Sequence, residues 1–467
     1  MELEQVSKEK EKVHRGIKRH IKRADSDMTS GSIWKLLITF ALPLAAGLLF
    51  QQLYNTVDTI VVGKFVGKEA LAAVGSTSSI INMLVGLCSG LSMGASVVIS
   101  QSYGAKDYVR LHDAVHTTIL VTIIMSVIAT GVGMAIVDPM LTMMSTPDDV
   151  FGAAHDYLTI YFAGISGLFI YNMGSAILRA VGDSRRPLYF LIFSAVLNVI
   201  LDLVFVIVFK MDIAGAAYAT IISQFLSAAL VLFVLTRSAG PYAIHWGHLC
   251  IRGSILKQVL SIGLPSGVQQ GLTSFSNVFV QSYVNAFGSD CMAGWSSYNK
   301  LDVYALVPAQ SIAMASTTFV GQNLGAKQYD RAKRGARFCI IIAVVMAELI
   351  GLCYYIWASQ LISLFDSTPG VVALGVQQAR TVALFYCLLA FSHSIAAVCR
   401  GAGRAVVPMM IMLSVWCVIR IIYIMLVVRF IGEIGYIYWA YPLTWAISST
   451  IYLIYYLRSD WVHGFER

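Results

Sequence analysis

The sequence predicts an all-α integral membrane protein, with twelve transmembrane helices in two parallel six-helix repeats around a central cleft and both termini cytoplasmic. Two observations predict this fold class. Of the 467 residues, 57% are hydrophobic and only 12% are charged, whereas a soluble protein carries about 25% charged residues. The chain also repeats its own motifs at an interval of 221 or 222 residues. The composition excludes a disordered chain, a fibrous chain and a soluble enzyme.

The apolar segments define the predicted helices. A helix needs about 20 predominantly apolar residues to cross a bilayer. Windows of that length predict twelve spans, at residues 33–62, 70–98, 113–137, 155–178, 189–209, 214–236, 255–286, 293–322, 335–358, 377–399, 406–429 and 436–457. Residues 1–32 precede them, mix Lys and Arg with Glu, and are expected to form a solvated or weakly helical tail without a secretory signal.

The positive charges predict the orientation. Cytoplasmic segments of membrane proteins carry an excess of Lys and Arg. The N-terminal tail, the loops after the even-numbered spans and the C-terminal tail hold 26 of the 33 Lys and Arg residues, and the loops after odd-numbered spans hold four. Both termini are therefore expected in the cytoplasm. The same bias accounts for the net charge of +8, so we expect no nucleic-acid partner.

Four pairs of matching segments show that the chain contains two copies of one unit. A Q-x-x-G-A-K loop occurs at Gln101 and Gln322, and an R-x-x-G-x-x-x-x-P loop at Arg179 and Arg400; Leu-Pro and Thr-Pro pairs recur at 222 residues. Six spans per copy place both copies in the same orientation, as parallel repeats. The predicted domains are a tail (1–32), an N-lobe (33–236), a cytoplasmic linker (237–254), a C-lobe (255–457) and a C-terminal tail (458–467). We expect the repeated loops to position cytoplasmic turns.

With these motifs the chain resembles the multidrug and toxic compound extrusion (MATE) transporters over residues 35–457. The residues that carry the resemblance are Tyr54-Asn-Thr-Val-Asp58-Thr, the two pairs of repeated loops, Asn198-x-x-x-Asp202 and Gly215-Ala-Ala-x-Ala-Thr220. The resemblance implies an antiporter coupled to H⁺ or Na⁺. Such a protein exports amphipathic or cationic drugs by alternating access across a prokaryotic plasma membrane. We expect a monomer.

Acidic residues inside the predicted spans are the candidate coupling groups, because a carboxylate at the bilayer centre costs about 2.5–3.5 kcal/mol. Asp58 and Asp202 lie in the outer thirds of the first and fifth spans, and Asn198 shares a helix face with Asp202. These oxygen-rich side chains suit a hard monovalent cation or a shared proton. The alternative is that Asp58 only caps its helix near water. The resemblance implies that Asp58, Asn198, Asp202 and Thr220 form the N-lobe cation site.

Candidate substrate-binding residues lie in both lobes, and for Gln51 and Tyr54 the resemblance implies this role. Gln51 and Tyr54 precede Asp58 on one helix face, and Asn172 of the fourth span is a plausible neighbour. In the C-lobe the candidates are Gln270, Tyr298 and Met314, for which ordinary packing or lipid contact is the alternative. Pro43, early in the first span, removes a helical hydrogen bond, and bending of this span in the family makes it a hinge candidate.

Three further ionisable residues lie in the C-lobe spans without an assigned role. Asp302 and Arg420 are predicted to form a buried ion pair, because a lone intramembrane Arg needs an anion; a structural latch and a functional switch are both open. Glu348 lies among apolar residues of the ninth span and is either protonated or faces the cleft. The glycines Gly86, Gly90 and Gly94 predict close helix packing.

The sequence lacks the motifs of an enzyme or a resident cofactor. We find no P-loop, nucleophile elbow or zinc-protease motif, so transport is expected to be driven by an ion gradient. His245, His248 and Cys250 lack a fourth partner, so no metal site is predicted. The eight scattered cysteines indicate no disulfide framework. The alternative function is a flippase for lipid-linked saccharides, from a related superfamily, which would need a cationic cleft; a receptor or an intramembrane enzyme is a weaker alternative.

Overall fold

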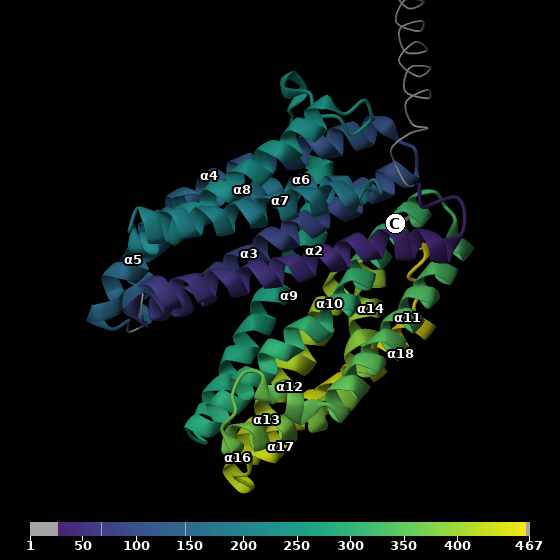
Figure 1. Ribbon diagram of the computed structural model, residues 1–467. Helices are drawn as coiled ribbons and strands as arrows, with labels where there is room; N and C mark the ends of the chain where they lie inside the picture. Colours follow the sequence, from purple (N-terminus) through teal and green to yellow (C-terminus); the bar gives the residue numbers. More distant parts are fainter. Residues whose placement is uncertain (1–26, 67, 145, 464–467) are drawn as a thin grey trace, which may run out of the picture.

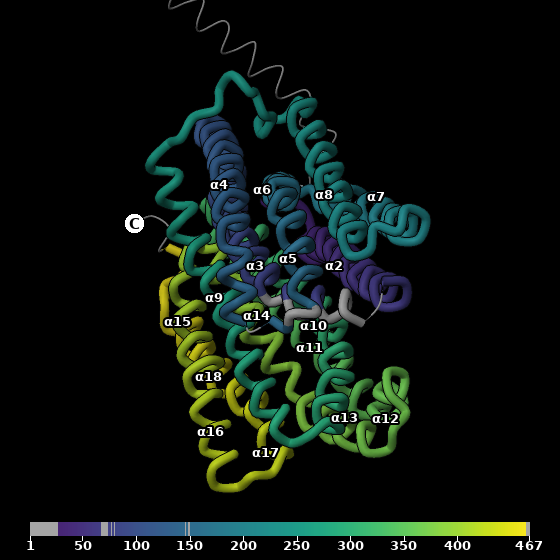
Figure 2. The backbone as a smooth tube through the Cα atoms, turned by 90° about the vertical axis from the view of Figure 1, so that its left-hand side faces the viewer, coloured from purple at the N-terminus to yellow at the C-terminus, as the bar shows by residue number. Residues whose placement is uncertain are grey.

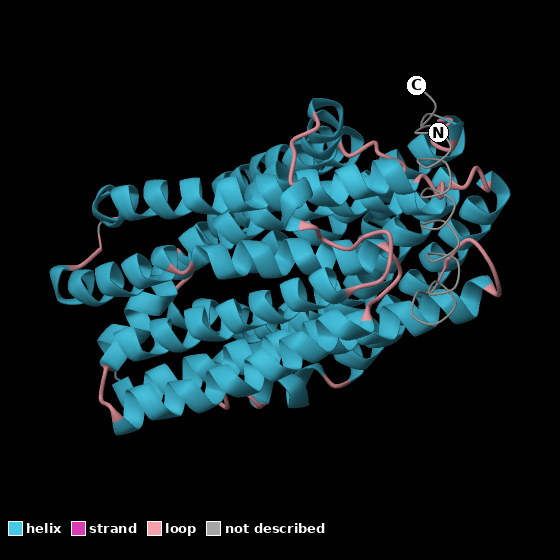
Figure 3. Ribbon diagram, turned by 90° about the horizontal axis from the view of Figure 1, so that it is seen from above, coloured by secondary structure: helices cyan, strands magenta, loops and turns pink. Residues whose placement is uncertain are grey.

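The computed structural model describes residues 27–66, 68–144 and 146–463. Within these residues the chain consists of helices joined by loops, without strands (Figure 3). Most of the predicted N-terminal tail and residues 464–467 therefore lie outside the described residues. All eight cysteines are free, as expected.

The first half of the chain forms one bundle of helices. Its elements, in which η marks a π- or 3₁₀-helical segment, are α2 (Ile33–Val61), η1 (Val62–Val66), α3 (Lys68–Gly104), α4 (Tyr108–Met143), α5 (Asp148–Ala163), α6 (Ile165–Ala180), α7 (Arg185–Asp202), η2 (Leu203–Val208) and α8 (Asp212–Arg237). α5 and α6 are bent by 47° relative to each other, at Gly164, which lies between them. These helices make up the N-lobe.

The second half forms the C-lobe after a linker that contains η3 (Trp246–His248). The elements are α9 (Gly253–Asn285), α10 (Ser289–Gly325), α11 (Tyr329–Ile356), α12 (Ala358–Ser363), α13 (Pro369–Val382), η4 (Ala383–Phe385), α14 (Tyr386–Gly401), α15 (Val406–Met412), η5 (Leu413–Ile419), α16 (Arg420–Phe430), α17 (Ile434–Tyr438) and α18 (Ala440–Arg458).

Each predicted span falls on one helix or on consecutive helical segments. Within the described residues, nine helices are long and apolar enough to cross a membrane, and the bent α5–α6 pair raises the number to ten. The remaining two predicted spans, α9 and α18, are less apolar because Gln, Ser, Thr and Tyr side chains interrupt them. The count of twelve spans and the cytoplasmic side of the termini stay predictions.

The two bundles meet at one end and diverge toward the other, with α2–α8 in one arm and α9–α18 in the other (Figures 1 and 2). At the end where they meet, both lobes contribute to shared cores. Phe40 of α2 packs in one core with Phe319 of α10, and Val98 of α3 shares a second core with Val259 of α9. We call this the closed end. Toward the other, open end, two separate cores each contain residues of one lobe alone.

Glycines allow α3 and α9 to cross in direct contact. A Cβ atom at Gly90 would lie 2.7 Å from the carbonyl oxygen of Gly263, and one at Gly94 would lie 2.8 Å from the backbone nitrogen of Gly263. Real Cβ atoms do not approach backbone this closely, so only glycine fits. The predicted close packing is confirmed, and its partner is the other lobe, not a neighbouring helix of the same lobe.

The repeated loops join the two lobes at the closed end. Gln101 Nε2 donates a hydrogen bond to the Gly401 carbonyl at 3.0 Å, and Gln322 Nε2 donates to the Ala180 carbonyl at 2.7 Å. Ala180 and Gly401 are the last residues of α6 and α14, where carbonyls lack an intrahelical partner. Each glutamine therefore caps a helix of the opposite lobe, and the two bonds are related by the internal repeat.

The glycine of each R-x-x-G loop has a conformational reason. Gly182 and Gly403 have φ angles of 97° and 80°, in the left-handed region that a side chain with a Cβ rarely adopts. The loops thus turn sharply after α6 and α14 and leave the final carbonyl of each helix facing the glutamine of the other lobe.

Candidate functional site

The structure brings Asp58, at the end of α2, next to Asp202, the last residue of α7. The two carboxyl groups are close enough to interact directly. Asn198 and Asp202 are 3% and 0% exposed. Within the described residues, Asp58 Oδ1, both oxygens of Asp202 and both polar atoms of the Asn198 amide have no hydrogen-bond partner. Buried polar atoms are nearly always bonded, so this cluster of unbonded atoms is the candidate functional site of the N-lobe.

The local fold explains the cluster. Asn198 and Asp202 are one turn apart on α7, which packs against both α2 and α8. The helix changes to the π-helical segment η2 directly after Asp202, and π-helical turns inside longer helices are frequent at functional sites. Asp202 therefore lies at the junction between the α-helix α7 and the wider π-helix η2.

Two tyrosines lie close to the acidic pair, and a third lies beside one of them. Tyr54 of α2 and Tyr157 of α5 both lie within electrostatic range of Asp58 and Asp202, and the ring of Tyr161 is 6.4 Å from that of Tyr157. Tyr54 is one of the residues predicted from the sequence, whereas the two tyrosines of α5 were not predicted. The only signal for them was their four-residue spacing on the fourth span, which placed them on one helix face.

The other N-lobe candidates have no hydrogen bond to the acids within the described part of the chain. Thr220 of α8 donates its hydroxyl to the Ala216 carbonyl at 3.0 Å, which leaves its oxygen able to accept. Asn172 of α6 donates to the Leu168 carbonyl at 2.9 Å. Gln51 lies on the Tyr54 and Asp58 side of α2 and is half-buried. Their roles in cation or substrate binding stay predictions.

The C-lobe substrate candidates do not gather at one place. Gln270 is exposed and lies against Gly86 at the crossing of α3 and α9. Tyr298 is only 3% exposed and belongs to the C-lobe core. Met314 packs into the core that α2 and α10 share at the closed end. In this conformation Tyr298 and Met314 therefore contact protein, and their assignment to substrate binding stays a prediction.

The predicted ion pair between Asp302 and Arg420 is wrong for this conformation. Asp302 Oδ1 accepts hydrogen bonds from Tyr386 at 2.5 Å and from Tyr298 at 3.4 Å. Arg420 donates to Thr444 Oγ1 at 2.9 Å, and its guanidinium lies over a tyrosine ring with 4.4 Å to the centroid. Tyrosine hydroxyls bond the Asp302 carboxyl group, and Thr444 and a tyrosine ring contact the Arg420 guanidinium. Neither side chain therefore needs the other as an ion-pair partner.

The remaining candidates from the sequence are Glu348 and Pro43. Glu348 of α11 lies beside Cys387, at the start of α14, and its Oε2 has no hydrogen-bond partner within the described part of the chain. Pro43 is inside α2, which continues as one α-helix from Ile33 to Val61. Its role as a hinge stays a prediction.

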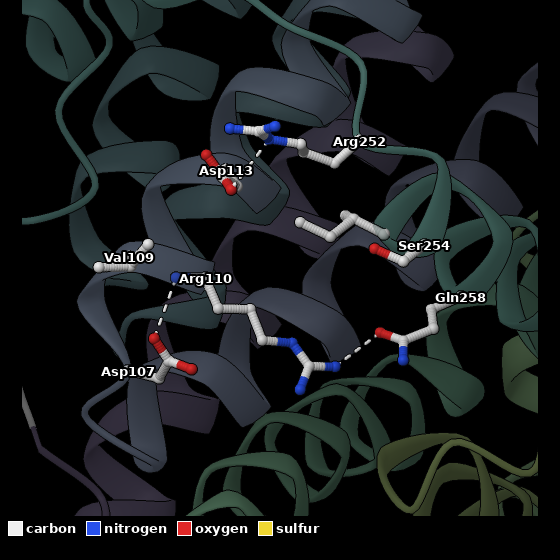
Figure 4. Close-up of a pocket in the computed structure, with 8 residues that line it drawn as sticks. Asp107, Val109, Arg110, Asp113, Arg252, Ser254 and Gln258 are labelled. Carbon is white, nitrogen blue, oxygen red and sulfur yellow. Dashed lines mark hydrogen bonds and ion pairs between the residues drawn. The ribbon is translucent and has the colours of Figure 1, made fainter.

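A cavity of about 430 Å³ opens at the closed end, away from the acidic pair. Its lining comes from the starts of α4 and α9 and the end of the linker (Figure 4), namely Asp107, Val109, Arg110, Asp113, Arg252, Ser254, Ile255 and Gln258. Arg110 Nη2 donates to Gln258 Oε1 at 2.7 Å across the two lobes. The cavity is therefore part of the contact that closes this end.

Tandem parallel bundles with buried polar groups in the membrane-spanning part are the architecture of a secondary transporter. The chain belongs to the MatE family: the family model MatE matches it twice, over residues 43–204 and 265–426. The starts of the two matches are separated by the interval of the Leu-Pro repeat. The chain is thus a transporter by family, not a member of an enzyme class.

Relatives agree with this assignment, and solved structures share the fold. The chain is 29% identical over 440 residues to the probable multidrug resistance protein YpnP of Bacillus subtilis, covering 93% of this chain and 97% of the relative. It is 25% identical to the probable multidrug resistance protein NorM of Thermotoga maritima, over 92% and 93% of the two chains. The fold matches an outward-facing multidrug resistance MATE family transporter of the MOP superfamily with a TM-score of 0.87, at 22% identity over 94% and 98% of the chains.

Proposed function

We propose that this protein is a cation-coupled antiporter that exports amphipathic or cationic compounds by alternating access across the plasma membrane, driven by H⁺ or Na⁺. The observation that carries the proposal is the cluster of unbonded buried atoms on Asp58, Asn198 and Asp202. The names of the multidrug resistance relatives support the class of substrate.

The chemistry of the cluster fits a small cation. Four of its five unbonded atoms are oxygens, and hard cations prefer oxygen ligands. Two neighbouring carboxylates in a low-dielectric site repel each other. A proton shared between them, or one Na⁺, removes that repulsion. Because either ion offsets one of the two negative charges, the two compete for one site.

The arrangement of the lobes fits one half of an alternating-access cycle. If the termini are cytoplasmic as predicted, the closed end faces the cytoplasm and the lobes diverge toward the outside (Figure 1). Asp58 and Asp202 lie beyond the shared cores, in the part of the N-lobe that has its own core. In the proposed cycle a cation that enters from outside binds to this pair, and its binding displaces substrate outward. The N-lobe acids favour cationic substrates and argue against the flippase alternative.

The test is efflux of ethidium from proteoliposomes that contain the purified protein, with a pH gradient and a Na⁺ gradient imposed separately. We expect efflux with one of the two gradients, and its loss to the level of protein-free liposomes in Asp202→Asn and in Asp58→Asn. The matched control is Asp302→Asn, which makes the same change at the buried acid of the C-lobe and should retain efflux.

The outcomes test the coupling site and the class of substrate separately. Gradient-driven efflux by Asp202→Asn at the wild-type rate would show that the acidic pair does not couple transport. Loss of efflux in Asp302→Asn alone would place coupling in the C-lobe. No efflux by the wild type under either gradient would refute export of this class of dye.

A further inference from the structure

Four of the nine histidines gather at one place on the N-lobe side of the closed end. His112 and His116 lie at the start of α4, and His245 and His248 lie on the linker between the lobes. The ring centroids are 3.9 Å apart for His112 and His116, 5.5 Å for His112 and His248, and 5.7 Å for His245 and His248. Ligand nitrogens of His112, His116 and His245 all lie within 4.8 Å of one another.

Local structure explains each pair. His112 and His116 are four residues apart on a helix, and two histidines at this spacing share one face and can bind one metal ion. His245 directly precedes the single turn of η3 and His248 is its last residue, and the His248 amide donates to the His245 carbonyl at 2.9 Å. In the sequence only the second pair stands out as a cluster, because the first lies more than 120 residues away in the chain.

Hydrogen bonds hold the linker against α4 and so hold the two pairs together. The His245 amide donates to His116 Nε2 at 2.9 Å, and Thr117 Oγ1 donates to the Cys250 carbonyl at 3.1 Å. Arg252 Nε donates to Asp113 Oδ2 at 3.1 Å (Figure 4). These bonds hold the linker against α4 at residue 245 and at residues 250–252. The fold itself therefore brings the four histidines together.

The buried member already has the hydrogen bond typical of a metal ligand. His116 is fully buried, and its Nδ1 is 2.8 Å from the His112 carbonyl oxygen. A carbonyl oxygen only accepts, so Nδ1 carries the proton and Nε2 carries the lone pair. Metal-bound histidines usually donate their second ring nitrogen in this way, which fixes the ring and the tautomer. An incoming metal ion would replace the His245 amide as the partner of Nε2.

The other ring nitrogens are not committed to carboxylates. His112 Nδ1 lies 3.9 Å from Asp113 Oδ1, beyond hydrogen-bond distance, and Asp113 is held by Arg252. His245 and His248 are exposed on the surface. Nitrogens bound to one tetrahedral Zn²⁺ are about 3.3 Å apart, so the exposed histidines need to move inward by roughly 1–2 Å on a surface segment.

We propose that His112, His116 and His245 form a binding site for a late first-row divalent cation, best matched by Zn²⁺, with His248 or a water molecule as the fourth ligand. Imidazole nitrogens suit zinc, copper and nickel, whereas Mg²⁺ and Ca²⁺ take oxygen ligands. The bound ion fastens the linker between the lobes to the N-lobe. This site is separate from the acidic pair and does not depend on the proposed antiport.

The test is zinc binding to the purified full-length protein in detergent, prepared with an affinity tag that contains no histidine. ZnCl₂ is titrated by calorimetry, and CoCl₂ serves as a visible probe, because its absorption reports tetrahedral nitrogen coordination. We expect one ion per chain, and binding at least tenfold weaker in His245→Ala and in His112→Ala. MgCl₂ should give no signal.

The controls separate this cluster from other histidines and from misfolding. His155→Ala and the double change His14→Gln with His20→Gln should bind zinc as the wild type does. His245 is exposed, so its replacement leaves the core intact, and gel filtration without metal checks this. Wild-type affinity in the His112→Ala, His245→Ala double variant would overturn the proposal, as would a loss of binding in the tail variant alone.

Discussion

Replacing the two motif glutamines should open the closed end of the protein. Gln101 and Gln322 each donate one hydrogen bond to the last carbonyl of a helix in the other lobe. Leucine has a similar size but cannot donate, so Gln101→Leu leaves the Gly401 carbonyl buried and unbonded. Stranding a buried acceptor costs about 1–3 kcal/mol.

That cost applies to the closed state and therefore shifts the equilibrium between the two transport states. Every 1.4 kcal/mol is a factor of ten in an equilibrium, so each single change should shift the ratio of the two transport states by about 5- to 150-fold toward the state in which this end is open. Gln322→Leu should have the larger effect, because Gln322 Oε1 also accepts a hydrogen bond from the Met28 amide at 3.1 Å.

The assay is the distance between spin labels at the opposite end of the molecule. Lys210→Cys and Glu433→Cys place labels on exposed residues of the N-lobe and the C-lobe, in a background without the eight native cysteines. We expect a larger share of short distances in both glutamine variants, because the outer ends approach when the closed end separates.

The control is Gln281→Leu, which removes a bond that stays within α9, from Gln281 Nε2 to Asn285 Oδ1 at 2.7 Å. Its distance distribution should equal that of the wild type. If Gln101→Leu and Gln322→Leu also leave the distribution unchanged, the cross-lobe bonds do not hold the closed state and the reasoning is refuted.

Three further outcomes follow from the fold. Gly182→Ala should lower the free energy of unfolding by about 1–2 kcal/mol, because the φ of Gly182 is 97°. Gly131 has open space around it, so Gly131→Ala should not lower it. Thermal melting in detergent checks both variants, and equal melting points would contradict backbone strain at position 182. Gly90→Ala should disfavour the contact of α3 with α9 and shift the same label distances, and an unchanged distribution would show that the helices can separate freely. Asp302→Asn and Arg420→Gln should be additive within about 0.5 kcal/mol in a double-mutant cycle, and a larger coupling energy would restore the predicted ion pair.

The sequence was sufficient for the helices and for their grouping into two lobes. A membrane-spanning helix satisfies its backbone within one segment, so local hydropathy marks it, and the repeated loops at Gln101 and Gln322 mark the two lobes. The pairing of Asn198 with Asp202 also followed from local spacing. These features depend on residues that are close together in the chain or on identical motifs.

Features set by tertiary contacts could not be predicted in the same way. The ion pair of Asp302 with Arg420 was expected because each charge needs a partner, but tyrosine hydroxyls and an aromatic ring serve that purpose here. Nothing in the sequence showed that Tyr157 faces the acidic pair. The histidines of α4 and of the linker likewise meet only because the linker folds back onto the N-lobe.

The reciprocal glutamine bonds have a consequence for how such a molecule can be assembled. Each half of the chain carries both the donor and the acceptor of the contact, since Gln101 corresponds to Gln322 and Ala180 corresponds to Gly401. A two-fold axis that pairs one patch with its own copy makes an isologous interface. One half, present twice, would satisfy the whole contact without a second sequence. Fusion into a single chain frees the halves to diverge elsewhere, and the acidic pair of the N-lobe is such a divergence.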